Sequence, residues 1–371
     1  QVVSHFFYNP ISLRDYMSYK VEISDNVDEN EWNDNLTNNP SSMVYQTTTW
    51  LKLYQITYGS KPIFITIRDQ NKKIVGQLAC LIHRKVFWQD ANPLSKIIGN
   101  MLKLGTVLWW YHGPIIHDKS NKDKILNIIL HSLEKVVHKN KVIMIRGISP
   151  PLEEQFPSEI FTKNGYKLDP RLTFIIDLKQ NLTELYDSLK KDTRYYIRKS
   201  EKEDFEFEVA EDKEAMIKFQ DLKYQAKKRE GKKALKNPNF FDKHWEIMRG
   251  EGREHLLIAR HKGEIIGAIL TLVFNGNMIQ HALANSPDKE LIGTFLTWNT
   301  LKWAQKMKYL TFDFAGVDPN PQTKKEKGIY FYAEKFGGKK YDYWVYTKII
   351  DRTKYYLSSG LKNPSRIIIK S

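Results

Sequence analysis

The sequence has 371 residues, of which 41% are hydrophobic and 13% aromatic, so it is long enough for two folded domains and too apolar for a disordered chain. No run approaches the roughly 18 apolar residues of a membrane helix, and the N-terminal stretch lacks the pattern of a secretory signal, so we expect a cytoplasmic protein. Lys and Arg exceed Asp and Glu by 58 to 43, which gives a net charge of +15. This charge favours nucleic acid, nucleotide phosphates or an acidic membrane surface as partners. The alternative explanation of the excess charge is a general bias of the sequence toward lysine.

The sequence motifs exclude several chemistries. The single cysteine, Cys80, lies in the apolar run QLACLI and is expected to be a buried small hydrophobe, not a nucleophile or metal ligand. His244, His255, His261 and His281 lack the spacing of metal ligands, so we expect no metal site. The patterns GxSxG, GxxxxGK[ST] and GxGxxG are absent, which argues against serine hydrolase, P-loop and dinucleotide-binding readings.

The first half of the chain has the apolar periodicity of alternating helices and strands. Residues 12–35 favour short helices, and Thr47 to Thr49 are candidate N-caps of a helix that Gly59 ends. In chain order the further predicted elements are a hairpin at 61–69 and 73–86, an aromatic strand at 107–117 broken by Gly113-Pro114, an amphipathic helix at 122–139, a strand at 142–148, a break at 149–157 and a return to the sheet at 161–178.

The second half repeats this order. Its predicted elements are a helix at 182–203, a strand at 205–210, a helix at 213–230, a polar linker at 231–239, a helix at 240–248, a hairpin at 255–274, a strand at 277–286, a helix at 295–307, a strand at 310–317, a loop at 318–328, a helix from 329 that Gly337-Gly338 ends, a strand at 340–350 and a basic tail at 353–371. The two hairpins share an apolar strand, a polar turn and a Val-Gly or Ile-Gly pair, so we predict two copies of one α/β unit, although weak repeats of this kind also arise by accident. The predicted domains are 1–168, joined by the C-terminal segment 345–371, and 169–344, which would carry the transfer site.

Asp313 stands near the end of the strand 310–317, directly before the predicted loop. A carboxylate at a strand end can accept a proton from an attacking ammonium or orient it. The alternative is a carboxylate that caps the loop DPNP, and the sequence leaves both open.

A basic and aromatic cluster occupies the predicted helix 182–203. Cations with interleaved rings suit phosphates and stacked bases, which favours a tRNA acceptor stem or a nucleotide diphosphate as the ligand. The alternative is a solvated basic helix, partly offset by the acids that follow at 201–204. The cluster comprises Lys190, Lys191, Arg194, Tyr195, Tyr196, Arg198 and Lys199.

Six segments together resemble the FemXAB aminoacyltransferases, the non-ribosomal peptidyltransferases of peptidoglycan bridges. They are YQTTTW, the Gly-Pro after the aromatic strand, LKKDTRYYIRKSEKE, KGEIIGAIL, DFAGVDPNP and KGIYFYAEKFGG, in the family's order between residues 45 and 350. The resemblance implies an α/β fold with mixed sheets, arranged as two tandem GNAT-like (acyl-CoA N-acyltransferase-like) domains. It also implies transfer of an amino acid from aminoacyl-tRNA, the co-substrate, to an amine of a nucleotide- or lipid-linked cell-wall peptide precursor, without a separate cofactor. The helices at 213–248 are short, as in family members without a coiled-coil arm, and we expect a monomer with peripheral contact to an anionic membrane surface.

The resemblance also implies site residues. Alignment of Gly328, Phe336 and the glycine pair places the family's aromatic and lysine pair, which stands close to the reacting ester, at Tyr332 and Ala333. The lysine is therefore missing, and Lys335, Lys325 and Lys327 are the candidate substitutes. Trp50, Tyr111 and His112 lie where the family lines its precursor site, although such aromatic residues usually belong to cores, and Tyr224 and Arg229 are weaker candidates for contacts to a diphosphate.

Two rival functions stay open. An acyl-CoA N-acyltransferase on the same fold would hold the CoA pyrophosphate on a glycine-rich turn at a helix N-terminus. The corresponding turn here, PDKELIG at 287–293, has one glycine and two acids and suits a pyrophosphate poorly, and the matching place at 113–122 is no better. The second rival is a non-catalytic RNA- or membrane-surface-binding protein, which the alanine at position 333 favours.

Overall fold

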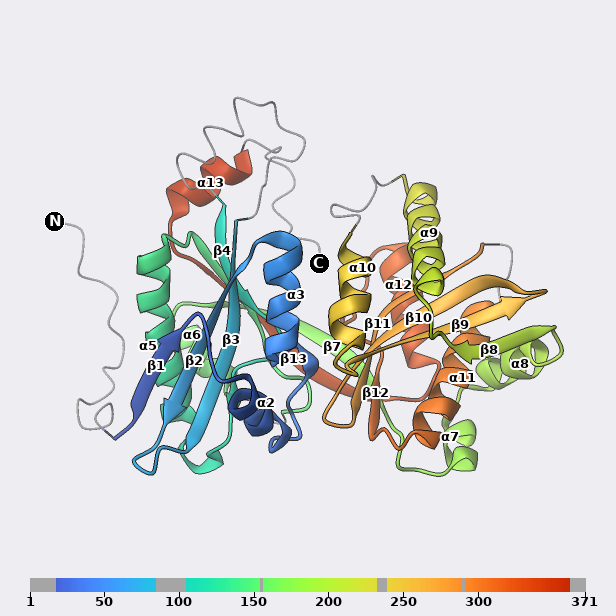
Figure 1. Ribbon diagram of the computed structural model, residues 1–371, viewed down its shortest axis with the longest axis horizontal. Helices are drawn as coiled ribbons and strands as arrows, with labels where there is room; N and C mark the ends of the chain where they lie inside the picture. The colour runs from blue at the N-terminus through green and yellow to red at the C-terminus, as the bar shows by residue number, and fades with distance from the viewer. Residues whose placement is uncertain (1–17, 85–104, 154–155, 232–238, 288–290, 361–371) are drawn as a thin grey trace. The chain divides into compact units, whose positions relative to one another are not determined.

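The computed structural model describes residues 18–84, 105–153, 156–231, 239–287 and 291–360, in two compact units (Figure 1). Unit 1 comprises Gln1–Asp169 with Trp344–Ser371, and unit 2 comprises Pro170–Tyr343. Strands β7 (Lys167–Asp177) and β13 (Lys339–Ile349) each begin in one unit and end in the other. Three of the predicted segments lie partly outside the described ranges. They are the polar linker, at residues 232–238, the turn PDKELIG, at residues 288–290, and the basic tail, from residue 361.

Unit 1 contains a mixed sheet whose strands follow the order β1-β2-β3-β4-β6-β13, with β5 paired to β3. Neighbouring strands are antiparallel except β4 and β6, which are parallel. The strands are β1 (Lys20–Ser24), β2 (Lys61–Arg68), β3 (Ile74–Arg84), β4 (Thr106–Trp110), β5 (Ile115–Ile116) and β6 (Met144–Ile148).

The helices of unit 1 pack on this sheet because each has one apolar face. Helix α3 starts where the Thr47 hydroxyl accepts the N–H of Trp50, and it ends at Gly59 in the left-handed conformation, both as predicted. The apolar face of the long helix α5 lies in the same core as Cys80, which is buried and free. The helices are α2 (Glu29–Thr37), α3 (Thr48–Tyr58), α5 (Lys122–Asn140), α6 (Ser158–Lys163) and α13 (Arg352–Gly360), with 3₁₀ turns at Val44–Gln46 and Lys119–Asn121.

Unit 2 contains a sheet of order β7-β12-β11-β10-β9-β8. Only β11 and β12 are parallel, and they pair over three residues, the last pair being Ile279 with Asp313. Beyond that pair β11 continues along β10, with a bulge opposite Leu270 and Thr271. The sheet therefore forks between β11 and β12. The strands are β8 (Phe205–Val209), β9 (Glu254–His261), β10 (Glu264–Phe274), β11 (Asn277–Asn285) and β12 (Thr311–Asp313).

Helices cover both faces of the unit 2 sheet. One face shares a core with α7 (Leu182–Ser188), α8 (Lys191–Ser200), α11 (Ile292–Lys306) and α12 (Lys324–Glu334). The other face packs against α9 (Lys213–Arg229), α10 (Phe240–His244) and the π-helix Trp245–Arg249. Successive side chains of β9 point to opposite faces of the sheet. Glu254 contacts His244 of α10, and the next residue, His255, contacts Trp303 of α11.

Three local predictions were wrong. The predicted helix 182–203 is two helices, because Leu189 is extended and buried and the N–H of Lys190 bonds to the Lys335 carbonyl. The charged end of the predicted loop 318–328 is the first turn of α12, which Thr323 caps. Residues 20–24 form strand β1, not a helix.

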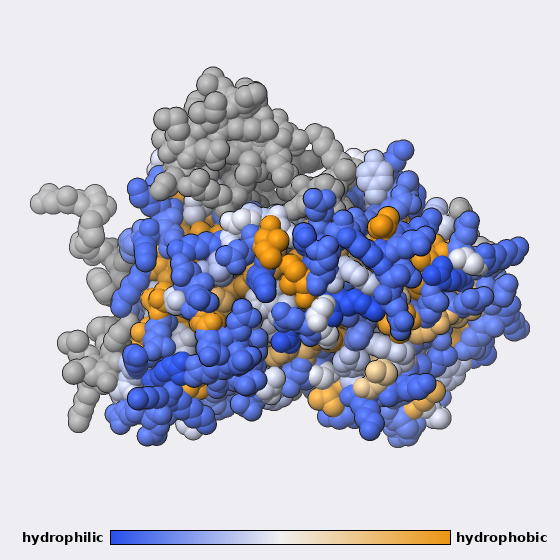
Figure 2. Space-filling model, in the orientation of Figure 1, coloured by the Kyte–Doolittle hydropathy of each residue, from blue (hydrophilic) through white to orange (hydrophobic). Residues whose placement is uncertain are grey.

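Polar and charged residues cover most of the face in Figure 2, and the apolar residues on it form small separate areas. None of the described helices is long and apolar enough to cross a bilayer.

The close packing of β6 predicts the effect of one glycine substitution. A Cβ at Gly147 would lie 2.0 Å from the Trp110 ring. We therefore expect Gly147→Ala to lower the free energy of unfolding by about 1–3 kcal/mol, measured by urea and thermal unfolding. As a control, Gly328→Ala in α12, where a Cβ meets nothing within 4 Å, should raise that free energy by roughly 0.5–1 kcal/mol. Unchanged stability of Gly147→Ala would contradict the packing.

Candidate active site

Helix α12 carries two of the predicted catalytic residues, Tyr332 and Lys335. The helix begins with a capping box, in which Thr323 accepts the N–H of Glu326 and the Glu326 carboxylate accepts the N–H of Thr323. Lys335 is the residue at which the helix ends.

The backbone after α12 is held against the end of α7. Gly337 has a φ of 78°, a conformation that favours glycine. A Cβ at this position would lie 2.6 Å from the carbonyl oxygen of Ser188, the last residue of α7. Only glycine therefore allows the close approach that fixes the end of α12 and, with it, Lys335.

Tyr332 and Lys335 both reach the first turns of α11. The Tyr332 hydroxyl donates to the Gly293 carbonyl at 2.9 Å and lies 2.5 Å from the Thr297 hydroxyl. The Lys335 amine donates to the Thr294 hydroxyl at 3.0 Å. A tyrosine hydroxyl and a lysine amine are thus brought together at the N-terminus of one helix.

Burial sets the protonation of these two groups. It lowers the pKa of Lys335 to about 8, while the amine lies 4.7 Å from the centre of the Tyr332 ring. It raises the pKa of Tyr332, so that the hydroxyl stays protonated. The pair therefore consists of an amine that changes charge near neutral pH and a permanent hydroxyl donor.

The structure also shows why position 333 holds no lysine. Ala333 is 2% exposed and lies in the apolar core with Phe312 and Phe336, where an ammonium group would be costly. Of the other two candidate substitutes, Lys325 forms an ion pair with Glu230 at 2.7 Å and Lys327 lies on the same first turns of α12. Lys335 is the candidate whose amine reaches α11.

Asp313 is buried at the sheet fork. Its Oδ1 accepts the N–H of Ala315 at 2.8 Å and the hydroxyl of Thr173, whereas its Oδ2 has no hydrogen-bond partner in the described chain. Burial raises the pKa of Asp313 to about 6. Phe314, the next residue, stacks on Phe336 at 5.5 Å, so Asp313 points to the opposite face from the Tyr332 and Lys335 pair.

The backbone of Lys335 also anchors the basic helix α8. Its carbonyl accepts the Thr193 hydroxyl at 3.0 Å and the Lys190 N–H at 3.2 Å. The Lys190 amine pairs with Glu334 at 2.5 Å. The start of α8 is therefore fixed directly beside the candidate catalytic lysine.

The charged and aromatic side chains of α8 lie at the surface. The Arg194 guanidinium donates to the Asp187 carbonyl at 2.8 Å, and that of Arg198 donates to the Tyr186 hydroxyl at 3.0 Å. Both acceptors lie on α7. Lys191 is exposed, as are Tyr195 and Tyr196, at 55% and 41%. The helix thus presents cations and open aromatic rings to the solvent.

The predicted precursor-binding residues of unit 1 belong to an aromatic cluster. The buried rings of Trp50 and His112 both contact Tyr45, with ring centres 4.8 and 4.9 Å away, and the half-buried ring of Tyr111 lies at 5.4 Å. Burial lowers the pKa of His112 to about 3, so its ring is neutral at physiological pH. Trp50 and His112 are packed as core residues, which leaves Tyr111 as the accessible member. Their contact with a precursor stays a prediction.

Tyr224 and Arg229 lie on α9, which packs on the face opposite α11 and α12. Both are exposed, Tyr224 at 42%. Glu230, the residue after Arg229, pairs with Lys325 at the start of α12. A diphosphate contact of Tyr224 and Arg229 stays a prediction.

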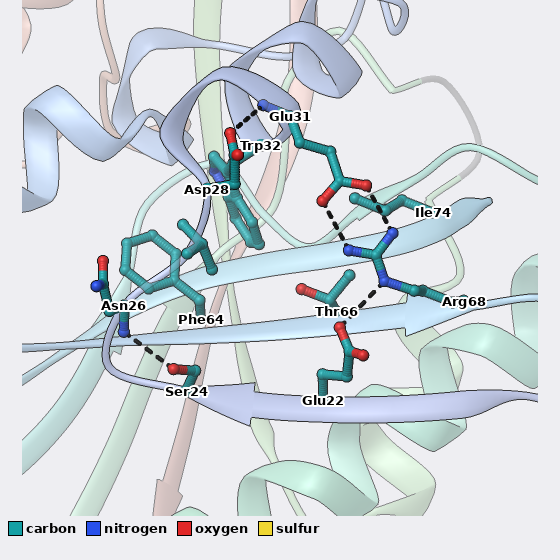
Figure 3. A pocket seen from close by; sticks show the side chains of 11 residues that line it. Glu22, Ser24, Asn26, Asp28, Glu31, Trp32, Phe64, Thr66, Arg68 and Ile74 are labelled. Atoms are coloured by element: carbon teal, nitrogen blue, oxygen red, sulfur yellow. Dashed lines mark hydrogen bonds and ion pairs between the residues drawn. The ribbon is translucent and has the colours of Figure 1, made fainter. Parts of the chain in front are cut away.

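A cavity of about 140 Å³ in unit 1 lies away from all predicted site residues (Figure 3). Arg68 crosses it and binds Glu31 through two bonds of 2.7 Å and Glu22 at 3.0 Å. Lys20 and then Arg68 hold the pKa of Glu22 below its ordinary value, and Arg68 does the same for the pKa of Glu31. The cavity's charged groups already pair with one another. Within the described ranges, no group of three His, Cys, Asp or Glu residues is placed to hold a metal ion.

Sequence reasoning missed the partners of the site residues. Gly293, Thr294 and Thr297 begin α11, and Thr173 on β7 binds Asp313. Small hydroxyl residues at a helix start are common, so they carry little signal.

A comparison of the sequence with known protein families gives a match in unit 2. Residues 187–325, within unit 2, match the family model of the acetyltransferase (GNAT) domain. No curated protein matches the chain by sequence. This part of the chain is therefore similar to an acetyltransferase domain of the GNAT type.

Solved structures extend the likeness to both units. The fold is similar to that of FemX, with a TM-score of 0.70, 15% identity, and coverage of 91% of this chain and 99% of that one. A tandem GNAT protein from the clavulanic acid biosynthesis pathway matches with a TM-score of 0.54 and 13% identity over 89% and 98% of the two chains. The C-terminal domain of a candidate lysylphosphatidylglycerol synthetase from Agrobacterium fabrum matches at 0.51 and 9% over 88% and 96%. The predicted tandem GNAT fold of the FemX type is confirmed.

The lowered pKa of Lys335 predicts its reactivity. Because the free amine is the nucleophile, modification of Lys335 by trinitrobenzenesulfonate should reach half its maximal rate near pH 8. Peptide mapping by mass spectrometry measures this rate, and Lys335→Arg identifies the signal. A half-maximum near pH 10.5 would contradict the buried environment.

The raised pKa of Asp313 predicts how stability depends on pH. The folded state holds the proton more tightly than the unfolded state, so this stabilisation is full below about pH 4 and is lost as pH rises through 6. Asp313→Asn keeps an oxygen for Ala315 and Thr173 and carries no charge. We expect its melting temperature to exceed that of the wild type at pH 8 by more than it does at pH 4. A difference that does not change with pH would contradict the raised pKa.

Proposed function

We propose that the protein is an aminoacyltransferase that moves an amino acid from aminoacyl-tRNA to an amine of a cell-wall peptide precursor. The observation that carries the proposal is the double role of Lys335. Its amine meets Tyr332 and Thr294 at the start of α11, and its carbonyl anchors the basic helix α8. A reactive ester and the phosphates next to it would thus be bound by adjacent parts of one unit.

The donor groups suit the chemistry of an activated ester. Attack by an amine forms a C–N bond and places negative charge on the carbonyl oxygen, which the Lys335 ammonium would stabilise. The Tyr332 hydroxyl donates to the Gly293 carbonyl and so holds its ring beside the Lys335 amine. The C–O bond of the ester then breaks, Lys335 gives a proton to the leaving ribose oxygen, the new amide nitrogen loses its extra proton to water, and Lys335 takes a proton back from water. A pKa of about 8 matches this role as a general acid near neutral pH.

The surface of α8 suits the nucleic acid part of the donor. Lys191, Arg194 and Arg198 offer charge to phosphates, and Tyr195 and Tyr196 offer faces for stacking. FemX and the lysylphosphatidylglycerol synthetase domain have a similar fold, and the name of the second agrees with aminoacyl transfer to a lipid acceptor.

One observation favours an acyl-CoA N-acyltransferase as the second candidate. Helix α11 begins at Ile292, and no side chain of the described residues caps its N-terminus, an end that in other helices can bind an anion such as a pyrophosphate. Isothermal titration with CoA separates the two. Tight binding of CoA would replace the first proposal.

The direct test is transfer of a radiolabelled amino acid from charged tRNA to nucleotide-linked and lipid-linked cell-wall peptide precursors. Lys335→Met should lower the transfer rate by about 10²–10³-fold and leave tRNA binding unchanged, because it removes a donor that acts on the developing charge. Tyr332→Phe should lower it less, since it removes only the bond to Gly293 and leaves the Lys335 amine in place. Wild-type protein that binds tRNA and transfers to no acceptor would contradict the enzyme and favour a non-catalytic binding protein.

The role of α8 has its own prediction. Replacing both Arg194 and Arg198 by Ala should weaken tRNA binding and reduce the slope of log K against log salt by about two, one for each lost phosphate contact. The matched control replaces Lys218 on α9 and Lys306 at the far end of α11, which should change the slope little. Equal slopes for the Arg194/Arg198 variant and the wild type would reject α8 as the phosphate site.

A further inference from the structure

A cavity of about 460 Å³ lies in unit 2, at the end where α7 begins and α11 ends. One wall consists of residues 178–182, which lead from β7 into α7, and the other consists of residues between 305 and 310, which lead from α11 to β12. None of the residues that line the cavity is acidic. Helix α7, at the lower edge of unit 2 in Figure 1, marks its place.

Hydrogen bonds join the two walls of this cavity. The Leu178 N–H donates to the Leu310 carbonyl at 2.9 Å. The side-chain amide of Gln305 donates to the Gln180 carbonyl. The Leu310 N–H donates to the Gly276 carbonyl at 2.7 Å, which ties this wall to the turn between β10 and β11. The backbone therefore fixes the cavity, and the side chains around it start from defined positions.

Three lysine side chains surround the cavity. Lys179 and Lys308 line it, and Lys306 lies two residues before Lys308. All three are exposed, and none of them forms an ion pair with a residue in the described part of the chain. Asp177 and Glu184, which lie nearby in the sequence, each accept a backbone N–H. The lysine ammonium groups are therefore available to an anion from outside the chain.

Large aliphatic side chains are exposed at the same place. Leu182 and Leu310, which line the cavity, are 42% and 44% exposed. Met307, between the two lysines at the end of α11, is 53% exposed. A single exposed leucine is ordinary on a protein surface. Three large aliphatic side chains among unpaired lysines instead indicate a surface for an amphipathic partner.

A membrane of anionic phospholipids matches both kinds of side chain. Its phosphates attract lysines close to the surface, and the boundary of its acyl chains accepts aliphatic side chains. A nucleic acid matches less well, because its bases stack on exposed rings. Tyr309, the aromatic residue of the lining, is half-buried, and its hydroxyl lies 2.6 Å from His255 Nε2. Helix α8 carries exposed rings beside cations, at Tyr195 and Tyr196.

We propose that this docking surface binds an anionic phospholipid membrane, with a lipid phosphate in the cavity and the aliphatic side chains at the acyl boundary. The docking surface comprises Lys179, Leu182, Lys306, Met307, Lys308 and Leu310. Docking goes beyond the proposed aminoacyl transfer and does not depend on it. Its consequence for the acceptor, a preference for the lipid-linked form over the nucleotide-linked form, rests on the proposed function.

The docking surface and the candidate active site lie at opposite ends of α11. Thr294, which binds the Lys335 amine, and Lys306 are about 18 Å apart along the helix axis, at 1.5 Å per residue. An acceptor amine anchored in the membrane therefore needs a reach of up to about 18 Å. An extended peptide of roughly five residues spans this distance.

The first test measures binding of the full chain to vesicles of phosphatidylcholine with and without phosphatidylglycerol, by flotation at physiological salt. We expect binding to the anionic vesicles only. Replacing both Lys179 and Lys308 by Gln should weaken it about 25-fold, roughly fivefold for each lysine. Replacing both Met307 and Leu310 by Ser should weaken it about tenfold.

The matched control replaces an exposed apolar residue and an exposed lysine of α9, as Ile217→Ser with Lys218→Gln. This variant should bind the anionic vesicles as the wild type does. If all variants bind equally, the net charge of the chain explains the binding and the docking surface is overturned. Absence of binding by the wild type would also overturn it.

The second test asks whether the aliphatic residues enter the membrane. The single cysteine, Cys80, is buried, so a thiol-reactive dye labels an introduced cysteine selectively. A polarity-sensitive dye on Met307→Cys should shift its emission to the blue when anionic vesicles are added, because it enters the acyl boundary. The same dye on Ile217→Cys should not shift. No shift at position 307, or equal shifts at both positions, would overturn the inference.

The remaining outcomes separate docking from the other proposals. Loss of tRNA binding on replacement of Lys179 and Lys308, with vesicle binding intact, would overturn docking and assign the cavity to RNA. Vesicle binding that depends on the docking surface, without transfer to any precursor, would support docking and overturn the proposed function alone. Where transfer occurs, a lipid-linked precursor in anionic vesicles should react faster than a nucleotide-linked one, and the Met307 and Leu310 variant should lose this preference.

Discussion

Lys335 joins three helices of unit 2 at one point. It ends α12, its carbonyl holds the start of α8, and its amine binds Thr294 of α11. The hydrogen bond of this carbonyl to Lys190 is also what separates α7 from α8. The candidate catalytic amine and the candidate phosphate surface are therefore fixed by the same residue. Any shift of the end of α12 would move both.

The sheet of unit 2 forks between β11 and β12, because these two strands pair over only three residues. Tyr332 and Lys335 lie on one face of this sheet, and Asp313 lies on the other, as does the buried pair of His244 and Glu254. On that second face, one carboxylate oxygen of Asp313 and one of Glu254 have no hydrogen-bond partner in the described chain, which is costly for stability and typical of functional sites.

The sequence predicted those features that depend on local periodicity and capping. Helix α5, helix α3 between Thr47 and Gly59, and both long hairpins follow directly from the spacing of apolar residues. The break at Leu189 could not be predicted, because its cause is a bond to Lys335, which is distant in the sequence. The resemblance to FemXAB supplied Tyr332 and pointed to Lys335, whereas their partners on α11 are small residues without a signal.

The histidines show a different limit of sequence reasoning. His244 and His281 lack the spacing of metal ligands and were set aside for that reason. Their association depends on the pairing of β9, β10 and β11 and on the packing of α10, which no local pattern reveals. Asp313 could be singled out because the end of a strand is recognisable in the sequence. The face of the sheet to which its side chain points could not be predicted, because it depends on how β12 pairs with β7.

The central claim is that the aminoacyl end of a charged RNA lies between α12 and the start of α11. The most direct measurement is photo-crosslinking with an RNA acceptor helix that carries a stable amide-linked amino acid and a photoreactive group on its terminal adenosine. The account predicts crosslinks to residues 292–297 and 332–335, which free CoA does not displace. Crosslinks confined to other parts of the chain, or their loss on addition of CoA, would contradict it.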